Sequence, residues 1–166
     1  PPVRVIRRRD YKFDGRGFLG DVRQQTFVVG LDGGARRQLT REAFDHLAPA
    51  WSPDGATIAV RRGSPGNMLR SQIALIDVPT GGVRAITPAM GGQICAWSPG
   101  GDRLLITGSD EDGGQPDFYL YDLAADALRR LTDDLPFLPA TRGDSGSGAI
   151  AWLDGDDVLC HAVRAG

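Results

Sequence analysis

Apolar residues along this chain come in short runs of four to six positions, and each run is ended by a turn rich in Gly, Pro and Asp. Thr57 to Val60 and Gln72 to Asp77 are two such runs, and Ser52-Pro53-Asp54-Gly55 is one of the turns. Proline fixes φ, aspartate bonds its own backbone and glycine supplies positive φ, so this tetrapeptide favours a tight turn. Short strands joined by such turns predict an all-β protein.

Two sequence marks recur along the chain at a nearly constant spacing. Trp51 and Trp97 are 46 residues apart, and each ends an apolar run just before a turn. A period in the forties that is made of short strands is typical of β-propeller blades. The first mark is Ala50-Trp51-Ser52-Pro53-Asp54-Gly55, Ala96-Trp97-Ser98-Pro99-Gly100-Gly101 and Ala151-Trp152-Leu153-Asp154-Gly155; the second is Arg37-Gln38-Leu39-Thr40, Arg84-Ala85-Ile86-Thr87 and Arg130-Leu131-Thr132.

The repeat predicts a partial β-propeller of about three four-stranded antiparallel blades over residues 1–166. Residues 46–87 and 92–132 each supply four strands, whereas 3–40 supplies the last three strands of an incomplete blade and 148–163 starts a further blade. Closed propellers have about four to eight blades. The thirteen predicted strands do not close such a ring, so we expect this chain to be a fragment of a larger propeller.

Composition and charge argue against some classes of partner but do not indicate a function. The formal net charge is −2, and hydrophobic residues make up 41% of the chain. Such a balance does not favour a nucleic-acid partner. The apolar runs are too short to cross a bilayer and the first residues have no signal-peptide pattern, so we expect no membrane partner and a cytoplasmic location. The sequence indicates no cofactor.

Several motifs resemble catalytic or metal sites, but each lacks the partners that the chemistry needs. Gly143-Asp144-Ser145-Gly146 looks like the surroundings of a protease nucleophile, yet His46 and His161 are placed in or next to strands and form no triad pattern. The acidic run Asp110 to Asp112 lacks the spacing of a calcium loop. Cys95 and Cys160 are expected to be buried free thiols. We therefore predict no catalytic residue and no metal site in this chain.

Residues 10–23 depart from the repeat, because the segment is longer than the loops at the same position of the other blades. It carries three aromatic residues and several charges. Long loops on a rigid scaffold often carry binding residues. One interpretation is a substrate-gating or interdomain loop; the other is that its aromatic residues pack against the edge of the blade. The candidate residues are Tyr11, Phe13, Asp14 and Arg23.

The segment from Tyr11 to Phe18 resembles the propeller of the prolyl oligopeptidase family of serine peptidases, in particular its acylaminoacyl-peptidase-like members. The resemblance continues through Arg37-Gln38-Leu39-Thr40 and the run Pro49 to Gly55, and it departs from the usual pattern at Gly100 and at Leu153-Asp154. These departures are expected to weaken two turns. The blade repeat by itself is shared with TolB-type proteins and with some propeller lyases.

The resemblance implies a parent protein with a C-terminal α/β-hydrolase domain that this chain does not contain. The propeller would then be a non-catalytic gate, which admits short or N-acylated peptides to a serine nucleophile on the missing domain. The alternative is a TolB-like propeller that serves as a platform for protein–protein interaction, with no enzyme attached. A lyase is less favoured, because such a site needs His and metal ligands, and the chain has two His.

An incomplete propeller also exposes blade faces that a closed ring would bury. Apolar faces and unpaired strand edges favour association. The expected partners are therefore the remaining blades of the parent, the hydrolase domain with its peptide substrates, or a second copy of this chain that completes a ring.

Overall fold

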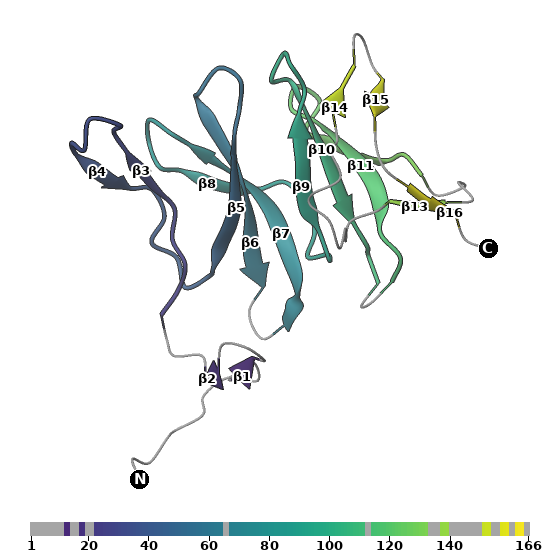
Figure 1. The fold of residues 1–166 in the computed structure, drawn as a ribbon, viewed down its shortest axis with the longest axis horizontal. Helices are drawn as coiled ribbons and strands as arrows, with labels where there is room; N and C mark the ends of the chain where they lie inside the picture. Colours follow the sequence, from purple (N-terminus) through teal and green to yellow (C-terminus); the bar gives the residue numbers. More distant parts are fainter. Residues whose placement is uncertain are drawn as a thin grey trace.

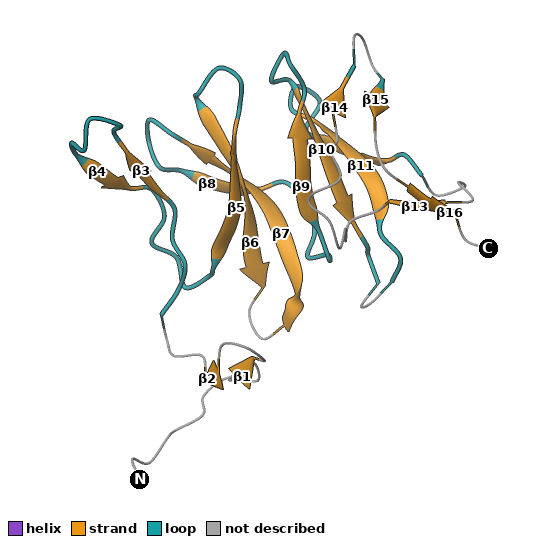
Figure 2. Ribbon diagram, viewed as in Figure 1, coloured by secondary structure: helices purple, strands orange, loops and turns teal. Residues whose placement is uncertain are grey.

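The computed structural model describes residues 12–13, 17–18, 22–64, 67–111, 114–132, 137–139, 151–153, 157–159 and 162–164. These residues hold sixteen strands, and no helix is assigned among them (Figure 2). Two four-stranded antiparallel sheets lie side by side, with two-stranded sheets on either side of them (Figure 1). The predicted all-β class and the partial propeller architecture are confirmed.

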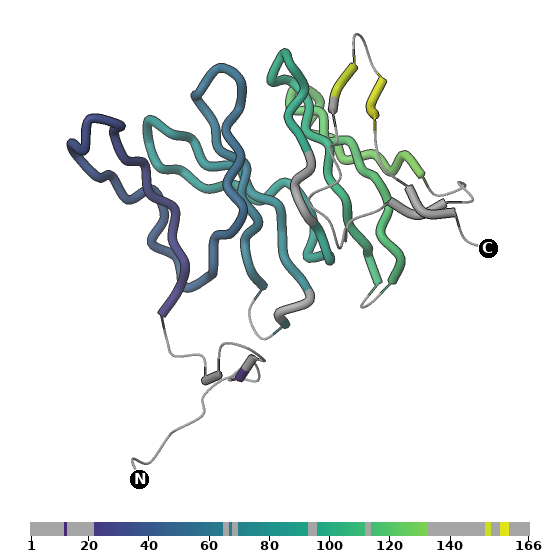
Figure 3. Tube along the Cα trace, viewed as in Figure 1, coloured from purple at the N-terminus to yellow at the C-terminus, as the bar shows by residue number. Residues whose placement is uncertain are grey.

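Each complete blade is a meander in which consecutive strands are neighbours. The chain runs through one sheet before it enters the next, as the colour order in Figure 3 shows. Tight turns between antiparallel strands produce this order without any crossover. The first complete blade consists of β5 (His46–Trp51), β6 (Thr57–Ser64), β7 (Asn67–Asp77) and β8 (Val83–Ala85); the second consists of β9 (Gln93–Trp97), β10 (Arg103–Gly108), β11 (Asp117–Asp122) and β12 (Ala127–Arg130).

Half-blades flank the two complete blades. On the N-terminal side β3 (Phe27–Val29) pairs with β4 (Arg36–Gln38), and on the C-terminal side β14 (Ala151–Trp152) pairs with β15 (Val158–Leu159). A separate small hairpin joins β1 (Lys12–Phe13) to β2 (Gly17–Phe18). The strand predicted within residues 3–9 lies outside the described residues.

The β6–β7 hairpin is longer than the sequence predicts. The Gly, Ser, Pro and Asn residues between Gly63 and Arg70 predict a polar loop, but paired residues continue to Ser64 and Asn67. The expectation was wrong because the polar side chains here mark the solvent-facing end of two strands rather than a loop. Arg62 and Gln72, for example, are direct cross-strand partners in this ladder.

The innermost strand of the last blade is interrupted. β13 (Phe137–Pro139) pairs with β16 (Ala162–Arg164). β14 pairs with β15, which comes just before β16 in the chain. β15 pairs with residues 152 and 151, and β16, further along the chain, pairs with residues 139 to 137. Because the partners follow one another in descending order, we interpret β13 and β14 as two parts of one strand. The segment with Gly143-Asp144-Ser145-Gly146 lies between these two parts in the sequence, and residues 140–150 are outside the described part of the chain.

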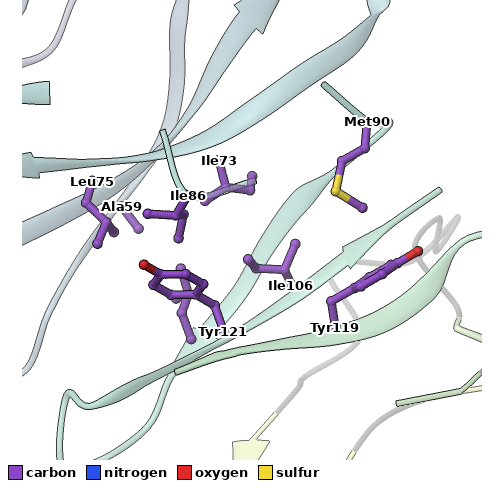
Figure 4. Packing of buried hydrophobic residues seen from close by; sticks show 9 residues of the cluster. Ala59, Ile73, Leu75, Ile86, Met90, Ile106, Tyr119 and Tyr121 are labelled. Atoms are coloured by element: carbon purple, nitrogen blue, oxygen red, sulfur yellow. The ribbon is translucent and has the colours of Figure 1, made fainter. Parts of the chain in front are cut away.

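Apolar side chains fill two of the spaces between neighbouring sheets. One cluster joins the N-terminal half-blade, through Leu39, to residues of the first complete blade such as Ile58 and Ile76. The second cluster lies between the two complete blades, where Ile73 and Ile106 pack near Tyr121 (Figure 4). Both faces of a central sheet are thus apolar, which explains why its strands read as continuous hydrophobic runs.

The repeated threonine follows the outer strand in the same way in the three blades whose outer strand is described. The hydroxyl of Thr40 accepts a hydrogen bond of 2.9 Å from the backbone N–H of Thr26. Thr87 does the same for Ile73 at 2.9 Å, and Thr132 does so for Phe118 at 2.8 Å. All three threonines are buried. The threonine hydroxyl thus accepts the hydrogen bond of a buried backbone N–H on the third strand, at the point where the fourth strand no longer pairs with it.

At two of its three positions, Trp97 and Trp152, the repeated tryptophan links its blade to the one before it. The indole Nε1–H of Trp97 donates to the carbonyl of Ala50 over 3.0 Å, and that of Trp152 donates to the carbonyl of Ala96 over 3.4 Å. Each acceptor directly precedes the tryptophan of the neighbouring blade. The recurring position is thus an anchor between blades, as expected for an aromatic residue with one polar atom.

The turn after each tryptophan keeps its hydrogen bonds although its sequence varies. The Ser52 hydroxyl donates to Asp54 over 2.6 Å, and the Ser98 hydroxyl donates to Asp102 over 2.7 Å. Gly100 occupies the position of Asp54, and Asp102, two positions further along, accepts the hydrogen bond instead. At Leu153 the backbone bond to the carbonyl of Asp157 remains, at 2.9 Å, whereas leucine has no hydroxyl to add.

A β-bulge interrupts the innermost strand of both complete blades. In β5 it lies between Leu47 and Ala50, and Ala48 adopts φ 49°. A residue with a Cβ atom pays about 1–2 kcal/mol in this left-handed region. The strained residue is exposed and lies on the strand that faces the propeller axis.

Replacing the threonine hydroxyl tests its role in the blade. We expect Thr87→Val to lower the free energy of unfolding by about 1–3 kcal/mol, because it leaves the buried Ile73 N–H without an acceptor. Thr87→Ser retains the hydroxyl and is the matched control. Urea denaturation followed by circular dichroism measures both; equal losses in the two variants would contradict this role.

Ala48→Gly is expected to stabilise the protein by up to about 1 kcal/mol, because glycine has no Cβ to clash at positive φ. Ala56→Gly, at an exposed position with no positive φ, is the comparison and should not stabilise. Thermal and chemical unfolding of the two variants gives the difference, and a destabilised Ala48→Gly protein would argue against strain at the bulge.

Candidate functional site

One face of the propeller carries the connections between successive blades. Residues 41–45 lead from β4 to β5, and residues 86–92 lead from β8 to β9. The β6–β7 and β10–β11 hairpins end on the same side, at the lower ends of the two four-stranded sheets in Figure 1. Loops on one face of a rigid scaffold are where binding residues tend to concentrate.

The structure places only part of the predicted site. Tyr11 and Asp14 lie outside the described residues, and for Phe13 the backbone alone is described, in β1. Arg23 lies against the first connection, because its Nε donates to the carbonyl of Ala43 over 3.0 Å. The gating or interdomain role of these four residues stays a prediction.

The segment around Arg23 holds the 41–45 connection in place. The backbone N–H of Gln24 donates to the carboxylate of Asp45 over 2.7 Å. The side chain of Gln25 donates to the carbonyls of Glu42 and Phe44 over 2.9 and 3.1 Å. These bonds fix the connection on the side of the N-terminal half-blade, so its backbone presents one defined shape.

On its other side the connection ends in an ionic cluster, formed by Glu42, His46, Arg62 and Gln72. Arg62 binds Glu42 through two parallel bonds, from Nε over 2.7 Å and from Nη2 over 2.8 Å. Its Nη1 donates to the Gln72 side chain over 2.9 Å. A two-point bond between guanidinium and carboxylate fixes the orientation of both groups.

His46 and Phe44 complete the surroundings of this ion pair. Nε2 of His46 lies 3.0 Å from Oε2 of Glu42, and since an ionised carboxylate only accepts, the ring carries a proton on Nε2. The guanidinium carbon of Arg62 lies 3.9 Å from the centre of the Phe44 ring, within the range of a cation–π interaction. The His46 side chain is fully buried, whereas 31% of Glu42 and 19% of Arg62 is exposed.

The cluster changes the acidity of its carboxylate. The hydrogen bond from Arg62 is the largest cause that lowers the pKa of Glu42, and the charge of Arg62 acts in the same direction. Partial burial opposes this shift. Glu42 is therefore ionised at neutral pH and holds Arg62 in place.

The second complete blade has no equivalent of this cluster. The register places Gly108 at the position of Arg62, and a Cβ atom on Gly108 would meet the side chain of Met90 at 2.4 Å. Met90 is buried and belongs to the apolar cluster between the blades. The charged cluster is thus a feature of one blade rather than of the repeat.

The described residues show a rigid charged surface and no catalytic arrangement. His46 bonds a carboxylate through Nε2, and its Nδ1 has no hydrogen-bond partner there, so no nucleophile is activated by this ring. Within the same residues no three His, Cys, Asp or Glu side chains group as metal ligands. Ser145, Cys160 and His161 lie outside the described part, as does the side chain of Cys95.

A helix of the length and apolarity that a membrane crossing needs is not found in the described part of the chain.

Comparisons with known proteins point to TolB-like propellers. No protein-family model matches the chain. It is 28% identical over 110 residues, 65% of its length, to the Tol-Pal system protein TolB of Francisella tularensis subsp. holarctica strain OSU18. Among solved structures, TolB from Acinetobacter baumannii matches with a TM-score of 0.56 and 25% identity over 83% of the chain. A putative TolB from Agrobacterium tumefaciens matches with a TM-score of 0.53 and 22% identity over 65%.

The matched part is short relative to these proteins. The chain covers 25% of the Francisella protein, and 36% and 40% of the two solved chains. An oligogalacturonate lyase in complex with manganese, at 19% identity and a TM-score of 0.51, shares the fold alone. The comparisons therefore support a TolB-like β-propeller, whereas the function of the whole protein is a matter for proposal.

Removal of the Glu42 charge tests the cluster through its pH dependence. Because the folded pKa of Glu42 is lowered, its stabilising effect is present above the unfolded value of about 4.3 and is lost as pH falls through the folded value. We expect Glu42→Gln to cost about 1–3 kcal/mol at pH 7, in line with bonds to charged groups. The difference from the original protein should shrink toward zero below about pH 4.

Urea denaturation at a series of pH values measures this difference. Glu111→Gln, at an exposed position of the β10–β11 loop, is the matched control and should change stability little at any pH. A Glu42→Gln penalty that stays constant down to pH 3 would show that the carboxylate acts through packing rather than through its charge.

Proposed function

We propose that this chain is part of a TolB-like propeller that serves as a platform for protein–protein interaction. The observation that carries the proposal is the TolB likeness over most of the chain, in sequence as well as in structure. The described residues add a scaffold whose connecting face holds the ion pair of Arg62 and Glu42 in a fixed orientation. Such a face is suited to recognition of a protein partner.

The face of the 41–45 connection is the proposed contact surface. Its backbone is held from both sides, so little conformational entropy is lost when a partner binds. Arginine and aromatic residues are enriched at protein interfaces, and here Phe44 and Arg62 are stacked and partly exposed. Arg41 and Ala43 are exposed beside them. The surface thus offers fixed charge and backbone groups to a protein partner.

The relatives suggest the kind of partner. The Francisella relative is named as a protein of the Tol-Pal system, and we propose that this chain, likewise, works within a system of several proteins. The chain covers a quarter of that relative, so the partner is proposed for the surface described here alone.

The peptidase gate is the second candidate, and it rests on the resemblance of the Tyr11–Phe18 segment to the prolyl oligopeptidase family. In that case the propeller admits short or N-acylated peptides to an α/β-hydrolase domain elsewhere in the parent protein. Tyr11, Phe13, Asp14 and Arg23 would then line the gate or contact the hydrolase. This candidate needs a serine nucleophile outside the present chain.

Affinity capture with matched charge reversals tests the platform. Arg41 is exposed on the connecting face, and Arg129 is exposed on the outer strand β12. The tagged full chain is crosslinked in an extract of its own host, and captured proteins are quantified. We expect Arg41→Glu to reduce the capture of a specific protein at least about tenfold, an effect of about 1.4 kcal/mol, and Arg129→Glu to leave it unchanged.

Two outcomes would contradict the platform. The first is a captured set that is the same for Arg41→Glu and for the unmodified chain. The second is covalent labelling of the parent protein by a serine-directed fluorophosphonate, together with inhibitable release of a chromophore from an acetylated amino-acid anilide. That second result would establish the peptidase gate instead.

A further inference from the structure

We propose that Asp32 is a site of spontaneous backbone modification, at which the link between Asp32 and Gly33 isomerises to an isoaspartyl link. Residues 31–34 lie in the turn that joins β3 to β4 (Figure 1). The described part of the chain holds two Asp-Gly pairs, Asp32-Gly33 and Asp54-Gly55. The reaction is intramolecular and needs no partner, so this inference does not depend on the proposed function.

The reaction starts from the neutral carboxyl group of the aspartate. The backbone nitrogen of the next residue attacks Cγ, its proton and the carboxyl hydroxyl leave together as water, and a cyclic imide forms. Water then opens the imide. Cleavage between the nitrogen and the original backbone carbonyl leaves a chain that runs through Cγ, whereas cleavage of the other bond restores aspartate. The water that was released is taken up again, and nothing is oxidised or reduced. A glycine after the aspartate favours attack, because it has no side chain to hinder the nitrogen.

The two Asp-Gly turns share one backbone arrangement. In each turn the glycine N–H donates to the carbonyl three residues earlier, over 3.1 Å in the turn of Asp32 and 3.0 Å in the turn of Asp54. The N–H of the residue after the glycine donates to Oδ1 of the aspartate, over 2.8 Å and 3.0 Å respectively. The attacking nitrogen is therefore restrained alike in both turns, and a difference in reactivity must come from other contacts.

The residue two positions before the aspartate distinguishes the turns. At Asp54 it is Ser52, whose hydroxyl donates to Oδ1 over 2.6 Å. Ser52 is buried, and its hydroxyl accepts the backbone N–H of Thr57 over 3.0 Å. At Asp32 it is Gly30, on which a Cβ atom would lie 2.6 Å from Oδ1 of the aspartate. The carboxylate of Asp32 thus lies where an anchoring side chain would have to be.

The serine also keeps the carboxyl of Asp54 in its ionised form. The hydrogen bond from Ser52 is the largest cause that lowers the pKa of Asp54, and the bond from the Ala56 N–H acts in the same direction. The neutral carboxyl that the attack requires is therefore scarcer at Asp54. Among the described residues, the hydrogen bond that Asp32 accepts comes from the backbone of Gly34, so no side chain holds this carboxylate away from the neighbouring nitrogen.

Backbone freedom acts in the same direction. Residues 30, 33 and 34 around Asp32 are glycines, whereas Pro53 precedes Asp54 and a single glycine follows it. Proline fixes its own φ, and glycine has few steric limits on φ and ψ. Rotation that brings the following nitrogen toward Cγ is thus less hindered at Asp32 than at Asp54.

Isomerisation inserts a methylene group into the backbone of this turn. The cross-strand partners next to it are Val29 and Arg36, and the β3–β4 ladder consists of three such pairs. A longer turn therefore disturbs a large part of the hairpin. We expect this hairpin to be the first part of the described chain that changes as the protein ages.

Prolonged incubation of the full chain at a mildly acidic pH, followed by trypsin digestion and mass spectrometry, tests the assignment. Cleavage after Arg23 and Arg36 gives a peptide in which Asp32 is the only aspartate. Isoaspartate leaves the mass unchanged and is recognised by its fragment ions in electron-transfer dissociation. We expect it to accumulate at Asp32 at least about tenfold faster than at Asp54.

Exchange of the distinguishing residue tests the cause. Gly30→Ser, at an exposed position, should slow the reaction at Asp32 about tenfold, and Ser52→Gly should raise the rate at Asp54 by a similar factor. Ser98→Gly removes the same kind of bond in the next blade and should leave both rates unchanged. Circular dichroism of each variant verifies that the fold is kept.

The unfolded chain in urea separates the fold from the local sequence. The hydrogen bonds of both turns are lost there, so the rates at Asp32 and Asp54 should approach each other. Three results would overturn the proposal: equal rates in the folded chain, a ratio in urea as large as that in the folded chain, or a rate at Asp32 that Gly30→Ser leaves unchanged.

Discussion

Burial of both faces of every sheet is the constraint on which this structure depends. A four-stranded sheet with apolar residues on both faces is stable only when neighbours cover it on either side. Ile58 and Ile76 are covered by the half-blade before them, and Ile73 and Leu75 by the blade after them. The blade at β9–β12 lies between the blade at β5–β8 and the C-terminal half-blade, whose Trp152 donates to its Ala96. The exposed apolar residues gather at the ends of the stack, at Phe27, Val29 and Trp51 on one side and at Leu153 and Leu159 on the other.

Specific hydrogen bonds keep this stacking in register. Within each blade a threonine hydroxyl closes the outer strand, and between blades an indole binds the preceding inner strand. Arginines add a link at the outer edge: Arg37 donates to the carbonyl of Pro79 over 3.3 Å, and Arg84 donates to Asp126 over 2.6 Å. Each of these arginines reaches the outer turn of the following blade. Charges on the outermost strands also discourage edge-to-edge association there.

With the sheet faces occupied by packing, the strand ends and connections are left for function. The 41–45 connection illustrates this division. Backbone and glutamine bonds hold one side of it, and the ion pair of Glu42 with Arg62 holds the other. At the equivalent position of the next blade, the side chain of Met90 lies against Gly108. The same scaffold therefore accommodates either a charged cluster or an apolar side chain at this position. This tolerance lets one blade carry a charged surface without any change in the stack.

The sequence by itself determined the architecture, because the repeat is local. A tryptophan before a turn and a threonine after an apolar run are readable in single segments, and they placed the strands of both complete blades close to their observed bounds. Local polarity misled only where solvent reaches a strand end, as at Gly63 to Arg70. The ionic cluster was decided by tertiary structure, because Glu42, His46, Arg62 and Gln72 meet only through strand register and the path of a connection. No local pattern marks such a meeting. Arg23 was singled out from sequence for the length of its loop, and only the fold shows which carbonyl it binds.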